Sequence, residues 1–150
     1  MILIAHDIRS LHNVGAFFRT SDAFGIKKIY LTGYTGCPPR KEIAKTALGS
    51  EHRVPWEHRE ELDPLITELK EKGMMVVALE IADRAIRIDE LTIPVENIAL
   101  ILGSEVEGIS SHILEQCDVI VSIPMSGIKK SLNVSVAAGI ALFAITQKIQ

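Results

Sequence analysis

Ile123–Gln150 reads IPMSGIKKSLNVSVAAGIALFAITQKIQ and joins two features that are seldom found together. A short strand ends at Pro124, and a polar, glycine-containing loop follows it from Met125 to Lys130. Ser131-Leu132-Asn133 then opens a helix that is apolar on nearly every face. Free backbone amides beside small polar side chains suit a small polar ligand, whereas a helix without a polar face must be covered on all sides. We therefore expect a ligand site beside a helix that is covered by its own core and by a second subunit.

Upstream of this segment, apolar strands alternate with amphipathic helices. We predict strands at 2–5, 28–31, 52–56, 74–79, 97–102 and 119–122, and helices at 13–24, 40–48, 60–72 and 132–149. Asn13 is the expected N-cap of the first helix, and Gly25 is expected to end it. Continuous apolar strands separated by helices are typical of a parallel sheet that is covered on both faces. The sequence therefore predicts the α/β class.

The common phosphate-binding motifs do not occur at the first strand. No Gly-x-Gly-x-x-Gly follows it, since Gly15 stands alone there, and there is no Walker phosphate loop. The polar residues that could bind a ligand instead follow the last strands. Ligands of open α/β sheets bind beyond the carboxyl ends of the strands, so we place the site there.

Composition sets broad limits on the protein class. With 150 residues, 47% of them hydrophobic, we expect one soluble, cytoplasmic domain without a membrane partner, because no apolar run reaches membrane-spanning length without a break. Cys37 and Cys117 fit a reducing compartment, and neither they nor the five histidines have metal-ligand spacing, so we expect no metal. A net charge of −3 argues mildly against nucleic acid, but basic residues cluster at 40–53 and 129–130, away from the acidic 57–71 segment.

Three motifs in order resemble those of the SpoU/TrmH family of RNA ribose 2′-O-methyltransferases, within the SPOUT superfamily. The first is Asn13–Arg19 (NVGAFFR), the second is Leu102–Ser110 (LGSEVEGIS), and the third is the Ile123–Gln150 segment. The resemblance spans essentially the whole chain. It implies a parallel-sheet α/β/α sandwich with a C-terminal deep trefoil knot, running from about Leu102 through the helix after Ser131. It also implies S-adenosyl-L-methionine as cofactor, tRNA or rRNA as partner, and a homodimer paired through the first and last helices.

The resemblance also assigns roles to individual residues. The implied catalytic residues are Arg19, Asn13, Glu105, Ser131 and Asn133, the implied cofactor-binding residues are Leu79, Leu102, Gly103, Ile123, Met125, Ser131 and Leu132, and the implied RNA-binding residues are Arg19, Arg40, Lys41, Lys129 and Lys130. A guanidinium is always protonated in proteins, so we expect Arg19 to stabilise a developing alkoxide and clamp a phosphate rather than act as a base. Glu105 could hold that arginine, or the arginine of a partner subunit.

Two residues of the second motif depart from the family pattern, which often has Asn at Ser104 and Gly at Val106. Neither change removes the carboxylate, although Val106 would stiffen the loop. The leading interpretation is a ribose 2′-O-methyltransferase of one domain, 1–150, without an appended RNA-binding domain. The alternatives are a SPOUT enzyme that methylates a base, and a cofactor-binding RNA-binding protein without catalysis.

Overall fold

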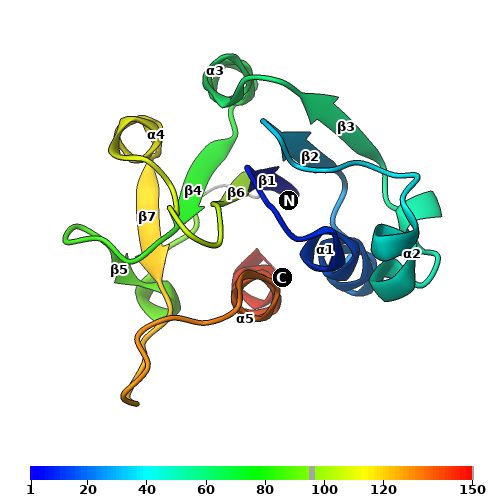
Figure 1. Cartoon of the computed structure of the whole chain (residues 1–150). Coiled ribbons are helices and arrows are strands. Elements are labelled where there is room, and N and C mark those ends of the chain that lie inside the picture. The colour runs from blue at the N-terminus through cyan, green and yellow to red at the C-terminus, as the bar shows by residue number, and fades with distance from the viewer. Residues whose placement is uncertain (95–96, 150) are drawn as a thin grey trace.

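Parallel strands form one seven-stranded sheet between two layers of helices (Figure 1). The computed structural model describes residues 1–94 and 97–149. The strands are β1 (Ile2–His6), β2 (Ile29–Thr32), β3 (Trp56–Arg59), β4 (Met75–Leu79), β5 (Ile86–Arg87), β6 (Ile98–Leu102) and β7 (Val119–Ser122). The helices are α1 (Leu11–Ala23), α2 (Lys41–Ala47), α3 (Leu62–Glu71), α4 (Ser111–Gln116) and α5 (Val134–Ile149), with short 3₁₀ turns at Ser50–His52 and Ile88–Glu90. The strand order is β3-β2-β1-β6-β4-β7-β5. The predicted parallel α/β sheet is therefore confirmed.

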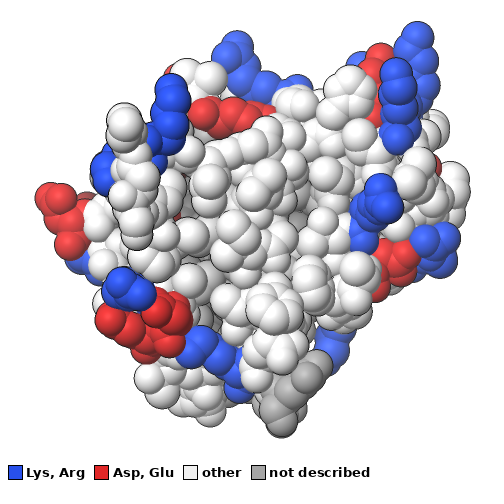
Figure 2. All heavy atoms as spheres, turned by 90° about the horizontal axis from the view of Figure 1, so that it is seen from below, with Lys and Arg blue, Asp and Glu red and all other residues white. Residues whose placement is uncertain are grey.

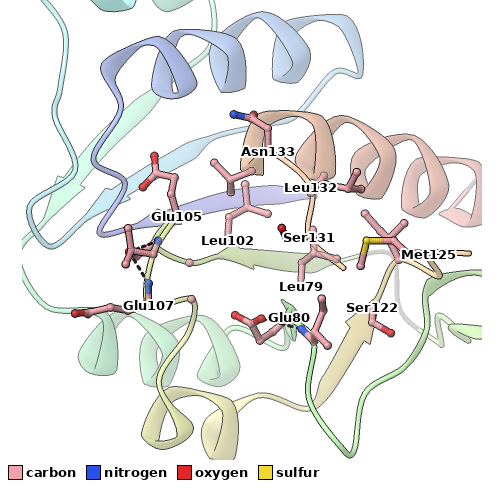
Figure 3. A pocket seen from close by; sticks show the side chains of 18 residues that line it. Leu79, Glu80, Leu102, Glu105, Glu107, Ser122, Met125, Ser131, Leu132 and Asn133 are labelled. Carbon is pink, nitrogen blue, oxygen red and sulfur yellow. Dashed lines mark hydrogen bonds between the residues drawn. The ribbon is translucent and has the colours of Figure 1, made fainter. Parts of the chain in front are cut away.

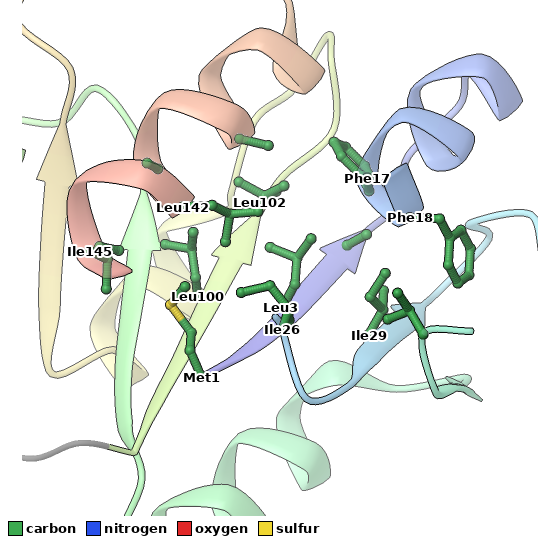
Figure 4. Packing of buried hydrophobic residues seen from close by; sticks show 14 of the residues in the cluster. Met1, Leu3, Phe17, Phe18, Ile26, Ile29, Leu100, Leu102, Leu142 and Ile145 are labelled. Carbon is green, nitrogen blue, oxygen red and sulfur yellow. The ribbon is translucent and has the colours of Figure 1, made fainter. Parts of the chain in front are cut away.

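The two faces of the sheet bury separate sets of apolar side chains. Successive residues of a strand point to opposite faces, and β1 shows this directly. Leu3 and Ala5 pack with α1, α2 and α5, while Ile2 and Ile4 pack with α3 and α4. Figure 4 shows the first of these clusters, in which Phe17 of α1 and Leu142 of α5 cover the same sheet face. The central strands are thus buried on both sides, which explains their continuous apolar sequences.

The helix predicted at 60–72 is α3, and its apolar residues Leu62, Leu65, Ile66 and Leu69 are all buried. The strand predicted at 52–56 is wrong. Leu48 and Gly49 take left-handed backbone conformations, and a 3₁₀ turn occupies Ser50–His52. Because Pro55 has no N–H to donate, regular strand pairing begins only at Trp56. The Pro55 carbonyl still accepts a hydrogen bond from the Ile29 N–H. Strand β5 and helix α4 were not predicted, because each is too short to show a period.

The predicted N-cap of the first helix, Asn13, is also wrong. Ser10, not Asn13, caps α1, since its side chain accepts the Asn13 backbone N–H at 3.2 Å. Asn13 lies inside the first turn, which leaves its amide side chain free to reach another element. The end of this helix was predicted correctly, because Phe24 is the C-cap and Gly25 follows with φ of 64°.

Three neighbouring strands place the loops of the second and third motifs at one edge. β6, β4 and β7 are adjacent, and Leu79 of β4 pairs with both Leu102 of β6 and Val121 of β7. The carboxyl ends of these strands therefore meet, as expected for a ligand site in an open sheet. None of the helices in the described residues has both the length and the apolar character that a bilayer crossing requires.

Candidate active site

A cavity of about 360 Å³ lies at this edge of the sheet. It is enclosed by the chain that leaves β4, the loop that follows β6, and the segment that joins β7 to α5. Figure 3 shows Leu79 and Leu102 along one side of the cavity, with Asn133 on the opposite side. All seven residues predicted to bind a cofactor line it: Leu79, Leu102, Gly103, Ile123, Met125, Ser131 and Leu132. Residues as far apart in the chain as Leu79 and Ala137 thus form one site.

The loop after β6 can adopt its conformation only because two of its residues lack a side chain. A Cβ on Gly103 would lie 2.6 Å from the carbonyl carbon of Gly108, and a Cβ on Gly108 would lie 2.3 Å from Glu80 Oε2. Gly108 also has φ of 67°. Ser104 fastens the loop from within, because its hydroxyl oxygen accepts the Val106 and Glu107 backbone N–H groups, each at 3.3 Å. The serine found where the family often has Asn therefore has a structural use.

Glu80 connects the chain after β4 to the loop after β6, and it was not among the residues predicted from the sequence. One of its carboxylate oxygens accepts the Ile81 backbone N–H at 2.8 Å, and the other accepts the Ile109 N–H at 2.9 Å. The side chain therefore ties the end of β4 to the loop after β6. Its position directly after a buried strand could have indicated it, since that is where polar residues reach a ligand site.

Glu105 is the centre of a hydrogen-bonded network at the start of α1. Its two carboxylate oxygens accept the backbone N–H groups of Arg9 at 2.9 Å and Ser10 at 3.1 Å, and the Asn13 side-chain amide at 2.9 Å. Desolvation by burial alone would raise the pKa of Glu105, but the hydrogen bonds from Arg9, Asn13 and Ser10 outweigh it and lower that pKa below its ordinary value. The side chain is therefore an ionised acceptor at neutral pH.

The network continues from Asn13 into the third motif. The Asn133 amide donates to Asn13 Oδ1 at 3.4 Å, and Asn133 Oδ1 accepts the Ser135 backbone N–H at 2.8 Å and its hydroxyl at 2.6 Å. Asn133 therefore caps α5, which begins at Val134 rather than at the predicted Leu132. Glu105, Asn13 and Asn133 come from three different motifs, and the structure brings them into one chain of hydrogen bonds. Ser131 lines the cavity beside them.

The predicted cationic residues are distributed differently. Arg19 is exposed on α1 and is not among the described residues that line the cavity, and all three hydrogen bonds found for Glu105 go to other partners. The expectation that Glu105 holds Arg19 is therefore wrong within one copy of the chain. Arg40 and Lys41 are exposed next to α2, whereas Lys129 and Lys130 are exposed on the loop after β7, at the other end of the sheet (Figure 1). One protomer does not gather them into a single patch.

Comparison with known proteins agrees with this geometry. A model of the SpoU rRNA Methylase family matches residues 1–143. The chain is 36% identical over 143 residues to the 23S rRNA (guanosine-2′-O-)-methyltransferase RlmB of Nitrosomonas europaea, covering 95% of this chain and 54% of that protein. It is 31% identical over 147 residues to the putative TrmH family tRNA/rRNA methyltransferase YacO of Bacillus subtilis, covering 97% and 58%. The chain thus spans a little over half the length of these curated relatives.

Solved structures with the same architecture include an AdoMet-bound rRNA methyltransferase from Sinorhizobium meliloti, with a TM-score of 0.91 at 26% identity, covering 97% of this chain and 55% of that one. The TrmH/SpoU tRNA modifying enzyme of A. aeolicus matches with a TM-score of 0.86 at 32% identity, covering 98% and 74%. The family model covers all three motifs apart from residues 144–149 of α5 and Gln150. The chain therefore belongs to the SpoU rRNA methylase family.

Proposed function

We propose that this protein transfers a methyl group from S-adenosyl-L-methionine to the ribose 2′-hydroxyl of a tRNA or rRNA nucleotide. The observation that carries the proposal is the contact between the cavity and the Glu105–Asn13–Asn133 network, which joins all three family motifs at one site. The printed name of the Nitrosomonas relative, a guanosine-2′-O-methyltransferase, supports the same reaction.

The residues of the cavity fit the proposed cofactor. Leu79, Ile123, Met125 and Leu132 provide apolar surface for an adenine ring. Glu80, Glu105 and Glu107 also line the cavity, and none of the described lining residues is Lys, Arg or His. S-adenosylmethionine carries a sulfonium, an ammonium and one carboxylate, so its net charge is positive. Carboxylates that line the cavity therefore favour it over its product, in which the sulfur is a neutral thioether. The Sinorhizobium neighbour was solved with AdoMet bound.

Methyl transfer makes a limited demand on the protein. When bound, the cofactor would supply the methyl group of its sulfonium. The leaving group is a neutral thioether, which needs no acid or metal to depart. The difficulty lies with the ribose hydroxyl, a weak acid that must lose its proton as the new C–O bond forms. Ser131 and Asn133 line the cavity at the N-terminal end of α5 and would exchange hydrogen bonds with that hydroxyl. Glu105 positions Asn13 and the start of α1, and so acts through its neighbours rather than on the substrate.

We place the stabilising cation across a homodimer. Arg19 is exposed on α1 and lies outside the cavity of its own copy, so a second copy would have to supply it. The surface beside it suits such pairing. Val136, Ile140 and Phe143 of α5 are 51%, 40% and 55% exposed, at the spacing of one helix face. Figure 2 shows a broad area without charged side chains on this side of the molecule. An apolar patch of this kind marks a protein interface, and pairing of α1 and α5 across it would cover the helix that has no polar face.

Three further features belong to the proposal. The segment from about Leu102 through α5 would form a deep trefoil knot, in a sheet where β6 lies between β1 and β4. Residues 1–150 would act as one methyltransferase domain. Arg40, Lys41, Lys129 and Lys130 would contact RNA phosphates. A cytoplasmic location would keep Cys37 and Cys117 as free thiols.

The decisive experiment is transfer of labelled methyl from S-adenosylmethionine to total RNA from cells that lack this protein, followed by nucleoside analysis. We expect label in a 2′-O-methylnucleoside. Label on a base would instead favour the base-methylating alternative and remove the role given to Arg19. Absence of label, with cofactor binding measured by calorimetry, would favour a non-catalytic RNA-binding protein.

A further inference from the structure

A second hollow, of about 420 Å³, lies on the other side of the loop that follows β6. Arg9, Tyr34, Ser104, Val106 and Glu107 line it. The last three also line the cofactor cavity, so this loop forms a wall that the two hollows share. A molecule in the second hollow would therefore be separated from the methyl donor only by this loop.

Tyr34 is held on a turn that is fastened at several points although its side chain is largely exposed. The residue is 58% exposed. Its backbone N–H donates to Asp7 Oδ1 at 3.0 Å, and Asp7 itself has φ of 53°, a conformation that costs free energy for a residue other than glycine. A Cβ on Gly33 would lie 1.9 Å from Asp7 Oδ1. The buried Thr35 hydroxyl accepts the Ile8 N–H at 2.9 Å. The turn thus fixes the backbone that carries an exposed aromatic ring.

Arg9 and Glu107 give this hollow one charge of each sign. The Arg9 backbone is fixed by its hydrogen bond to Glu105, and its side chain is exposed. Among the described residues, no hydrogen bond or ion pair engages its guanidinium, whose planar donors match a phosphate group. Glu107 is exposed and, when ionised, can only accept hydrogen bonds. An amino group on a nucleobase is a donor that suits it.

An aromatic ring, a guanidinium and a carboxylate acceptor together match the base and phosphate of a single-stranded nucleotide. Unpaired RNA bases stack on aromatic side chains, and their edges then remain open to hydrogen bonds. We propose that Tyr34 stacks on a nucleobase of the substrate RNA, at or next to the methylated nucleotide, while Arg9 contacts its phosphate and Glu107 its amino edge. This subsite rests on the proposed function and extends it, because a base held here directs its ribose towards the shared loop and the cofactor cavity.

The test compares Tyr34→Ala, Tyr34→Phe and the wild-type chain in two assays. The first is methyl transfer with varied RNA concentration, and the second is a direct binding titration with unfractionated tRNA and, separately, with fragmented rRNA. We expect Tyr34→Ala to lower kcat/KM for RNA, and RNA affinity, by about 5- to 150-fold, the range for loss of one base–aromatic stack. Tyr34→Phe keeps the ring and should stay within about two-fold of wild type. The dissociation constant for S-adenosylmethionine and the unfolding midpoint should not change.

Leu48→Ala is the matched control, because Leu48 is an equally exposed apolar residue, 60% exposed at the end of α2. Arg9→Ala should weaken RNA binding. It should also reduce the slope of the logarithm of the binding constant against the logarithm of salt concentration by about one, as expected for the loss of one phosphate contact. Wild-type RNA binding by Tyr34→Ala would overturn the subsite whether or not methyl transfer occurs, as would equal losses for Tyr34→Ala and Tyr34→Phe. If wild type binds RNA in a Tyr34-dependent way but transfers no methyl group to it, the subsite stands and the proposed reaction fails.

Discussion

Glu105 connects segments that lie far apart in the sequence. It accepts two backbone N–H groups before α1 and the Asn13 amide inside it, and Asn13 in turn contacts Asn133 at the start of α5. Only a carboxylate offers two acceptor oxygens without a competing donor. The role of this residue is therefore to fix the relative positions of the three motifs, and its charge state should influence stability.

Glu105→Gln tests this role through its pH dependence. Because the folded-state pKa of Glu105 lies below the ordinary value of 4.5, the folded protein binds fewer protons than the unfolded chain in that range. The stabilisation is therefore present above pH 4.5 and is lost as the pH falls through the folded-state pKa. We expect Glu105→Gln to lower the free energy of unfolding by roughly 1 kcal/mol at pH 7, and the difference from wild type to shrink below the ordinary pKa.

Urea unfolding midpoints measured from pH 7 to pH 3 would check this expectation. Glu115→Gln, at an exposed position of α4, is the matched control and should show little difference at any pH. A deficit for Glu105→Gln that stays constant across the acid range would mean that the carboxylate charge does not contribute.

Arg19 carries the charge that the proposed chemistry needs, and its substitution should separate catalysis from cofactor binding. Since Arg19 does not line the cavity of its own copy, we expect Arg19→Ala to bind S-adenosylmethionine as wild type does in calorimetry. Loss of one group that stabilises a developing alkoxide should lower methyl transfer about 100- to 1000-fold. Lys70→Ala, another exposed cation on a helix, is the control. Undiminished transfer by Arg19→Ala would remove its catalytic role.

At the scale of elements, α5 has a buried side and a side without a cover. Ala138, Ala141, Leu142 and Ile145 are fully buried against the sheet, whereas Val136, Ile140 and Phe143 are exposed. The ring centroid of Phe143 lies 6.1 Å from that of Phe24, the C-cap residue of α1. A second copy, related by a two-fold axis, would cover this face and bring each α1 to the other subunit's site.

Mixing two inactive variants tests that shared site. Arg19→Ala lacks the cation, and Asn133→Ala lacks the network residue that caps α5. If each site takes Arg19 from one copy and Asn133 from the other, half of randomly paired dimers are mixed, and each mixed dimer contains one intact site. We expect about one quarter of wild-type transfer after equal mixing and subunit exchange, measured with the labelled methyl assay.

The control for this experiment adds Phe143→Glu to both variants, which should prevent pairing and abolish the recovered activity. Sedimentation velocity would confirm the change in mass. If both active residues come from the same copy, no mixed dimer has an intact site, and the mixture stays as inactive as the separate variants.

Sequence patterns predicted those elements whose period is long enough to read. Helix α3 repeats its core residues over about two turns, and β7 lies at the predicted residues 119–122, although it ends at Ser122 and not at Pro124. The errors have local causes, as in β3, where Pro55 delays the strand. Ser10 and Asn13 are both good capping residues, and their roles are distinguished by the hydrogen bond from the Asn13 N–H to the Ser10 hydroxyl and by the contact of the Asn13 side chain with Glu105. That contact joins residues 92 positions apart, so no local pattern could indicate it.

At the scale of the whole molecule, the position of the cavity was predictable from the sequence, but its internal contacts were not. The motifs indicated which loops would meet, and the adjacent ends of β4, β6 and β7 bear this out. Arg9 and Tyr34 have no distinguishing pattern in the sequence, because their proposed role depends on residues that the strand order brings near them. Threading of the chain is likewise invisible to periodicity, since it depends on the order in which strands enter the sheet rather than on their composition.

A knotted C-terminal segment has a mechanical consequence that an unknotted sheet lacks. If α5 passes through the chain between Leu102 and Ser131, stretching the unfolded protein from its two ends tightens the knot instead of releasing it. An extended chain spans about 3.3–3.6 Å per residue, and residues held in a tight knot do not contribute to that length. We expect the fully stretched chain, measured with optical tweezers, to fall short of its contour length by several residues. When the same protein is pulled between its N-terminus and Glu107, α5 stays free to slip out, so the stretched segment should reach its full length. Full extension in both geometries would show that the chain is not threaded.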